Sequence, residues 1–98
     1  MANHQRARTL QQARTTFTGA QVLEAARIFF ARKNSIYSAF PEKEGPTFLV
    51  LRGQGGEEVA IAVSPVPGGN RVRGSTLLFD QALDRFLSTL PAPADLSA

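Results

Sequence analysis

The chain has no cysteine and no tryptophan, and only one histidine occurs among its 98 residues. Without cysteine there are no disulfides, no thiolate chemistry and none of the usual structural zinc sites, which depend on cysteine ligands. The one histidine, His4, lies in a polar opening stretch where nothing in the sequence would hold it for acid–base or triad catalysis. These absences predict a protein that is not an enzyme and that holds no metal ion or other cofactor.

Long apolar runs are also lacking. Runs such as Phe48–Leu51 are far shorter than the roughly 18 residues that a membrane-spanning helix needs. The opening stretch has no apolar centre of the kind found in secretory signals. We therefore expect a soluble, cytoplasmic protein with no membrane partner.

Acidic residues are absent before Glu24, whereas Arg6, Arg8 and Arg14 lie in that stretch. The segment Met1–Thr16 has no sustained apolar periodicity, so we expect a flexible basic arm there. A mobile segment of one charge steers association with a polyanion or with an acidic protein surface. The chain as a whole carries a formal charge of +3, and the residues after the first helix are close to neutral.

Two segments have the apolar periodicity of amphipathic helices. Thr18 and Gln21 form a capping box that begins the first helix, whose apolar face continues to Lys33. The second helix begins within Thr76–Asp80 and ends at Pro91, which cannot continue it. Both helices are expected to bury one face on the rest of the chain.

Short extended segments separated by turn residues lie between the two helices. They are Ser35–Phe40, Thr47–Arg52, Glu57–Ser64 and, less regularly, Asn70–Ser75. The glycines of Gly53–Gly56 predict a tight hairpin, and the prolines of Pro65–Asn70 predict a looser connection. The fold class is therefore α+β, a two-layer sandwich in the order α-β-β-β-(β)-α, with an antiparallel sheet and two amphipathic helices on one face. We expect one domain over 17–91 and a flexible tail over 92–98.

The order of helix, three strands and helix, with Gly45-Pro46 between the first two strands, resembles double-stranded RNA-binding domains over about Phe17–Leu90. In that family, lysines at the start of the second helix bind phosphates. The corresponding stretch here, Ser75–Asp80, is apolar and then acidic. The resemblance therefore concerns topology, and it assigns neither a function nor a family.

Arginines supply the first candidate site. Arg71 and Arg73 are two residues apart on a candidate strand, so their side chains are expected on the same face, close to the start of the last helix and its exposed N–H groups. Together with the basic arm they predict a discontinuous surface for nucleic acid or an acidic partner. The residues of this surface are Arg6, Arg8, Arg14, Arg71 and Arg73.

Apolar strand residues supply the second candidate site. Phe48–Leu51 is apolar at every position. Either Phe48 and Val50 or Leu49 and Leu51 must therefore face away from the helices. On the next strand, small residues share one face and would allow a second sheet to approach closely. We expect this outer face to be buried against a second copy or another protein. The predicted interface residues are Leu49, Leu51, Ala60 and Ala62.

Carboxylates and Tyr37 offer the little chemistry that an enzyme or a small-ligand binder would need. Glu57 and Glu58 are adjacent on a strand, so they point to opposite faces. Asp80 and Asp84 share a helix face, but a position near the helix N-terminus already accounts for Asp80.

Two functions remain open. The first is an interaction and assembly module that associates with itself through the sheet and uses the basic arm on an acidic partner. The alternative is a nucleic-acid-binding module with sequence-independent phosphate contacts from the arm, Arg71 and Arg73.

Overall fold

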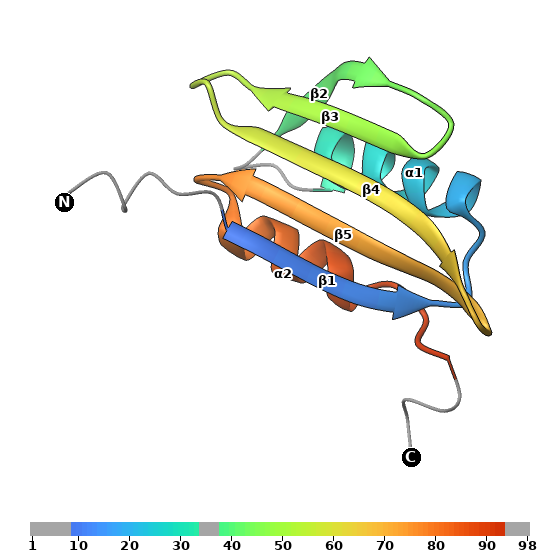
Figure 1. Ribbon diagram of the computed structural model, residues 1–98. Helices are drawn as coiled ribbons and strands as arrows, with labels where there is room; N and C mark the ends of the chain where they lie inside the picture. Colours follow the sequence, from blue (N-terminus) through green and yellow to red (C-terminus); the bar gives the residue numbers. More distant parts are fainter. Residues whose placement is uncertain (1–8, 34–37, 94–98) are drawn as a thin grey trace, which may run out of the picture.

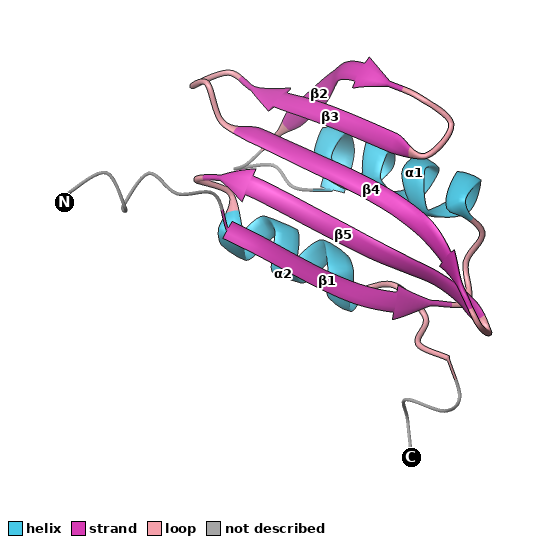
Figure 2. Ribbon diagram, in the orientation of Figure 1, coloured by secondary structure: helices cyan, strands magenta, loops and turns pink. Residues whose placement is uncertain are grey.

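Two helices pack against one face of an antiparallel sheet (Figures 1 and 2). The computed structural model describes residues 9–33 and 38–93, and within them the sheet has five strands in the order β1-β5-β4-β3-β2. The strands are β1 (Thr9–Thr15), β2 (Ala39–Glu44), β3 (Phe48–Gly53), β4 (Glu58–Val66) and β5 (Gly69–Leu77). The helices are α1 (Gly19–Ile28), which continues as the π-helical turn η2 (Phe29–Lys33), and α2 (Asp80–Ser88). The α+β class and the antiparallel sheet are confirmed, but the element order is β-α-β-β-β-β-α.

The added first element is the main difference from the sequence-based prediction. The segment Thr9–Thr15, expected to belong to a flexible arm, forms strand β1 and pairs with β5 over its whole length. On the helix side of β1 the Gln11 amide donates to the Asp80 carbonyl at 3.2 Å, and Thr15 is fully buried. Backbone pairing and polar side chains hold this strand, so it has no apolar alternation for a sequence pattern to detect. The folded part begins no later than Thr9, and the order differs from that of double-stranded RNA-binding domains.

The capping box that begins α1 is confirmed. The Thr18 hydroxyl accepts a hydrogen bond from the Gln21 backbone N–H at 3.1 Å, and the Gln21 side chain accepts one from the Thr18 N–H at 2.8 Å. These two bonds satisfy donors that the first turn of a helix leaves unpaired. Phe17, just before the cap, packs partly buried against the core, so the chain direction at the helix entry is fixed.

The core lies between the helices and the sheet. The Phe86 ring of α2 lies 5.6 Å from the Phe29 ring and 5.8 Å from the Phe30 ring, measured between centroids. These contacts join the second helix to the turn that follows the first. The sheet contributes side chains from its helix-covered face, which include Leu49, Leu51, Val59, Ile61, Val63 and Val72.

Strands β4 and β5 meet in a tighter turn than the prolines predicted. Pro65 lies inside β4 and pairs with Asn70, so only Pro67 and Gly68 form the connection. Gly68 has φ +81°, a conformation that glycine adopts without a steric penalty. At Gly69 a β-carbon would overlap the carbonyl oxygen of Thr15, so glycine also allows the end of β1 to approach β5 closely.

Candidate functional site

The sheet face that the helices leave uncovered, called the outer face below, carries most of the candidate residues. Strand pairing arranges its side chains in rows across the sheet, because partners in register share a face. One row contains Gln12 of β1, Arg73 of β5, Ala62 of β4 and Phe48 of β3. The next contains Leu10, Ser75, Ala60 and Val50. The outer face therefore has a basic side on β1 and β5 and an apolar side on β3 and β4.

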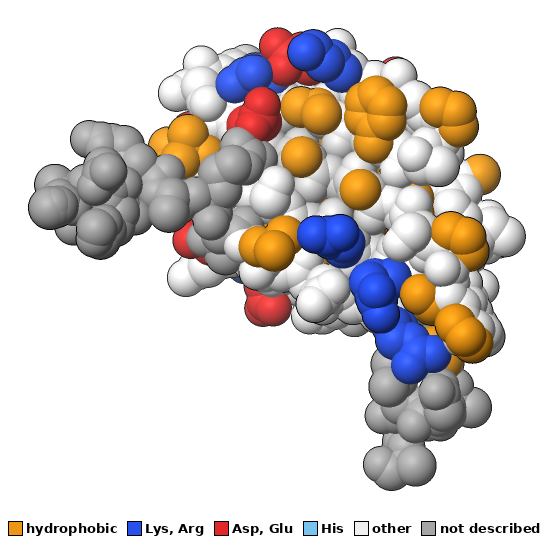
Figure 3. All heavy atoms as spheres, viewed as in Figure 1, with side chains coloured by type: hydrophobic (Ala, Val, Ile, Leu, Met, Phe, Trp, Pro, Cys, Tyr) orange, Lys and Arg blue, Asp and Glu red, His pale blue; other side chains and the backbone are white. Residues whose placement is uncertain are grey.

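The basic side consists of Arg14, Arg71 and Arg73, called the arginine cluster below. Arg14 of β1 is the register partner of Arg71 of β5, and Arg73 follows two residues along the same strand. The Arg14 Nη2 donates to the Pro67 carbonyl at 3.0 Å, which ties this side chain to the β4–β5 turn. In Figure 3 basic side chains form a line beside exposed apolar ones. Among the described residues, neither Arg71 nor Arg73 forms an ion pair with a carboxylate.

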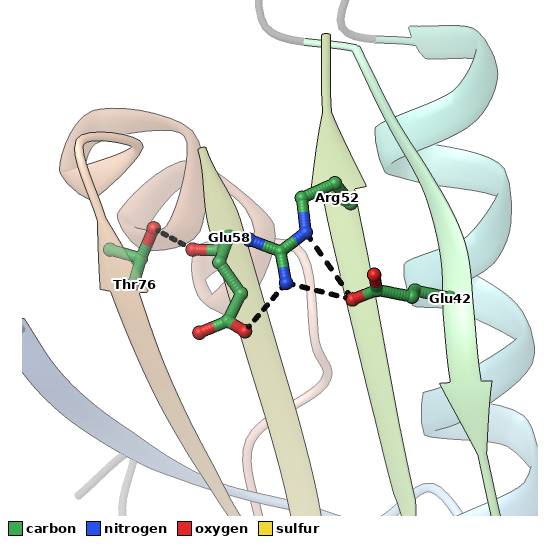
Figure 4. Close-up of polar contacts among 4 residues, drawn as sticks. All are labelled: Glu42, Arg52, Glu58 and Thr76. Carbon is green, nitrogen blue, oxygen red and sulfur yellow. Dashed lines mark hydrogen bonds and ion pairs between the residues drawn. The ribbon is translucent and has the colours of Figure 1, made fainter. Parts of the chain in front are cut away.

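At the opposite end of the outer face, Arg52 is already engaged by carboxylates (Figure 4). Its Nη2 lies 2.9 Å from Glu42 Oε1 and 3.4 Å from Glu58 Oε2, so β3 is linked to β2 and β4. The hydrogen bond to Glu42 and the negative charge of Glu42 raise the pKa of the Arg52 guanidinium. The Thr76 hydroxyl donates to the Glu58 carbonyl at 2.7 Å and fixes the start of β4. Arg52 is therefore neutralised locally, unlike Arg71 and Arg73.

Arg27 of α1 is engaged in the same way on the helix side. It donates to Glu44 and to Glu24, the latter at 3.0 Å, and the hydrogen bond to Glu44 raises its pKa more than any other contact does. Four carboxylates thus neutralise two arginines away from the arginine cluster. The positive charge that remains open on the outer face is concentrated on β5.

The apolar side of the outer face is a shallow hollow of about 270 Å³. Its lining includes Leu10, Phe48, Val50, Ala62, Arg73 and Ser75, so an aromatic residue and an arginine border the same depression. Phe48 is 39% exposed although it lies on β3, which has a neighbouring strand on each side. Ring atoms of Phe48 lie directly against Gly45, where a β-carbon would overlap them. The ring is therefore held in place on the β2–β3 hairpin.

The structure separates the predicted interface residues. Ala60 and Ala62 lie on the outer face, Ala62 exposed and Ala60 half-buried. Leu49 and Leu51 are fully buried against the helices, so they are not accessible to a partner. Phe48 and Val50 take the outer positions instead. The sequence could have predicted this, because Arg52 alternates with Phe48 and Val50 along the strand and so shares their face. A charged residue there favours the face that the helices leave uncovered.

The predicted binding residues are also only partly brought together. Arg71 and Arg73 point to the same face, as their spacing predicts, and Arg14 joins them because it lies in β1. The start of α2 does not join them: it follows the far end of β5 and lies across the sheet from the outer face (Figure 1). The predicted help from helix N–H groups is therefore wrong. Arg6, Arg8, His4 and Tyr37 lie outside the described residues.

Sequence reasoning missed Leu10 and Gln12 because it did not recognise β1 as a strand. It placed Glu57 and Glu58 on opposite faces, in agreement with their contacts: Glu57 accepts from the Gly55 N–H at 2.9 Å, and Glu58 pairs with Arg52.

No group of three histidine, cysteine or acidic side chains in the described part of the chain is placed to hold a metal ion. Four hollows lined by described residues measure about 260 to 320 Å³, at or below the small end of ligand pockets.

Comparison with protein-family models, with curated proteins and with solved structures found no match. Over residues 9–33 and 38–93, no helix has the length and the apolar character that crossing a membrane requires. The cytoplasmic location stays a prediction.

Proposed function

We propose that this protein is a non-enzymatic nucleic-acid-binding module that holds phosphates on the outer face of its sheet. The observation that carries the proposal is the pair Arg71 and Arg73, side by side on an exposed face with no carboxylate partner among the described residues. Guanidinium groups bind phosphate oxygens in a bidentate way, and such contacts do not depend on the base sequence of the nucleic acid. Arg14 extends the surface on β1. Arg6 and Arg8, which precede β1 in the sequence, belong to the same proposal.

Charge favours a polyanion over a second copy as the occupant of this face. The outer face carries Arg14, Lys43, Arg52, Arg71 and Arg73 against Glu42 and Glu58. Two such faces stacked on each other would bring like charges together and desolvate them, which costs free energy. A nucleic acid would instead release counterions on binding. Excess positive charge therefore supports nucleic acid as the first candidate.

Self-association through the sheet is the second candidate, and one observation favours it. On the outer face Phe48 and Ala62 are exposed and Val50 is half-buried, so the described residues leave part of this apolar surface open. Small side chains on β4 would let another sheet approach closely. In that case the arginine cluster would contact an acidic surface of a partner, as expected of an interaction and assembly module.

The proposal is tested by fluorescence anisotropy of a labelled oligonucleotide at low salt and at about 0.2 M salt, with Arg71→Gln, Arg73→Gln and Arg85→Gln variants. Arg85 is the matched control because it is exposed on α2, behind the sheet. We expect binding that weakens steeply with salt. Each outer-face variant should lower the salt slope by about one, and the control should not.

Two results would contradict the proposal. One is no detectable binding of the wild-type chain at low salt. The other is equal weakening by Arg85→Gln and Arg73→Gln, which would mean that net charge, rather than the outer face, is what the oligonucleotide senses. Sedimentation of the same samples reports self-association independently.

A further inference from the structure

We infer that the outer face binds single-stranded rather than duplex nucleic acid, with a base stacked on Phe48 and the adjoining phosphates on Arg73 and Arg71. This inference rests on the proposed function and names the form of nucleic acid that the site accepts. It is carried by the position of one exposed aromatic ring and one arginine on the borders of the same hollow.

The register of the sheet sets the spacing between ring and cation. Phe48 pairs with Ala62, and Ala62 pairs with Arg73, so the two side chains lie two strands apart in one row. Two strand spacings are about 10 Å at the backbone, and both side chains border the hollow between them. Ala62 at the centre leaves room for a flat ring. Arg71, about 7 Å from Arg73 along β5, would meet the neighbouring phosphate.

Phe48 is held ready for stacking before any ligand arrives. Its ring lies against Gly45, and the Gly45 N–H donates to the Phe48 carbonyl at 3.0 Å to close the β2–β3 hairpin. A ring held in this way loses little conformational entropy when a base stacks on it. With 39% of its surface exposed, Phe48 has room for a stacking partner on the side away from the glycine.

The apolar side of the face distinguishes single strands from duplexes. A duplex keeps its bases stacked on one another and presents phosphates and sugars to a flat surface. Phe48, Val50 and Ala62 would then lie against polar backbone and would desolvate it without compensation. A single strand has free base faces, which stack on aromatic side chains without regard to sequence. A single strand can therefore place bases on the apolar side of the face and phosphates on its basic side, whereas a duplex can contact only the basic side favourably.

The test compares one labelled mixed-sequence oligonucleotide, alone and annealed to its complement, for the full chain and for Phe48→Leu, Phe48→Trp and Phe40→Leu. Phe40 is the matched control because it is also an exposed phenylalanine of the sheet, and it lies outside the hollow. We expect the single strand to bind at least tenfold more tightly than the duplex. Phe48→Leu should weaken single-strand binding roughly 5- to 100-fold, the range that base stacking supports, while Phe48→Trp and Phe40→Leu keep it.

Thermal unfolding of each variant shows whether a loss reflects misfolding, and Phe48→Trp adds a fluorescence signal that a stacked base should quench. Equal or tighter binding of the duplex, or equal effects of Phe48→Leu and Phe40→Leu, would overturn the inference and leave the proposed function intact. Absence of binding to either form at low salt would instead contradict the proposed function itself.

Discussion

Arg14 and Arg71 lie directly opposite each other on β1 and β5, with both side chains on the outer face. Like charges in directly opposed positions destabilise a sheet. Paired cations of this kind are typical of a binding surface, where an anion between them relieves their repulsion.

Replacing Arg71 with threonine should therefore stabilise the protein slightly while it weakens polyanion binding. We expect a gain of up to about 1 kcal/mol in the free energy of unfolding at low salt, measured by urea denaturation, because a β-former replaces a repelled charge. The gain should shrink as salt screens the repulsion. Arg73→Thr is the control, since its neighbours in the row are Gln12 and Ala62, so no directly opposed like charge is removed there. Equal gains from both variants would contradict this account.

Gly45→Ala should displace the Phe48 ring. A β-carbon at this position overlaps ring atoms, so the ring or the hairpin must move, at a cost of up to the roughly 1–3 kcal/mol that overpacking causes in a core. Unfolding in urea measures the cost, and oligonucleotide binding should fall along with it. Gly55→Ala is the matched control in the β3–β4 hairpin, because its β-carbon would meet only the flexible carboxylate end of Glu57. A Gly45→Ala variant as stable as this control would mean that the ring is not held by the glycine.

Phe86→Ala should be among the most damaging single substitutions. Phe86 is fully buried and its ring contacts those of Phe29 and Phe30, so its removal leaves a cavity that costs about 3–5 kcal/mol. Phe40 is 48% exposed, and Phe40→Ala should cost less than about 1 kcal/mol. Thermal or urea unfolding compares the two directly. Similar losses would mean that the core does not centre on this aromatic cluster.

Removal of β1 should destabilise the whole domain. Two truncated chains are compared: one lacks residues 1–8 and keeps β1, and the other lacks residues 1–15 and has lost it. Strand β1 pairs with β5 throughout and buries Thr15. The shorter chain should unfold at a markedly lower urea concentration, since β5 becomes an edge and the inner surface near Val72 opens to water. If both truncations unfold together, the segment behaves as the flexible arm expected from its sequence.

The limits of sequence reasoning follow from the kind of interaction involved. The capping box at Thr18 and the helical periodicity around Phe86 are local, so they were predictable. The pairing of β1 with β5 joins residues about sixty positions apart through backbone groups, and no local pattern encodes it. The proximity of Arg14 to Arg71 depends on that pairing, so the arginine cluster could be predicted only in part. The placement of Arg71 and Arg73 on the same face, in contrast, follows from strand geometry alone.

Opposite charges placed at Ala62 should separate the two candidate functions. Ala62 is exposed between Phe48 and Arg73, so Ala62→Glu and Ala62→Lys should each change the free energy of unfolding by only about 0.5 kcal/mol. If the outer face binds nucleic acid, the glutamate should pair with Arg73 and repel phosphate, whereas the lysine should preserve or strengthen binding. If two copies stack through this face, either long side chain should break the contact, because only small residues allow the sheets to approach. Anisotropy and sedimentation on the same two variants distinguish these outcomes. Binding that is lost equally with glutamate and lysine, together with a dimer that falls apart in both, would identify the outer face as an assembly surface.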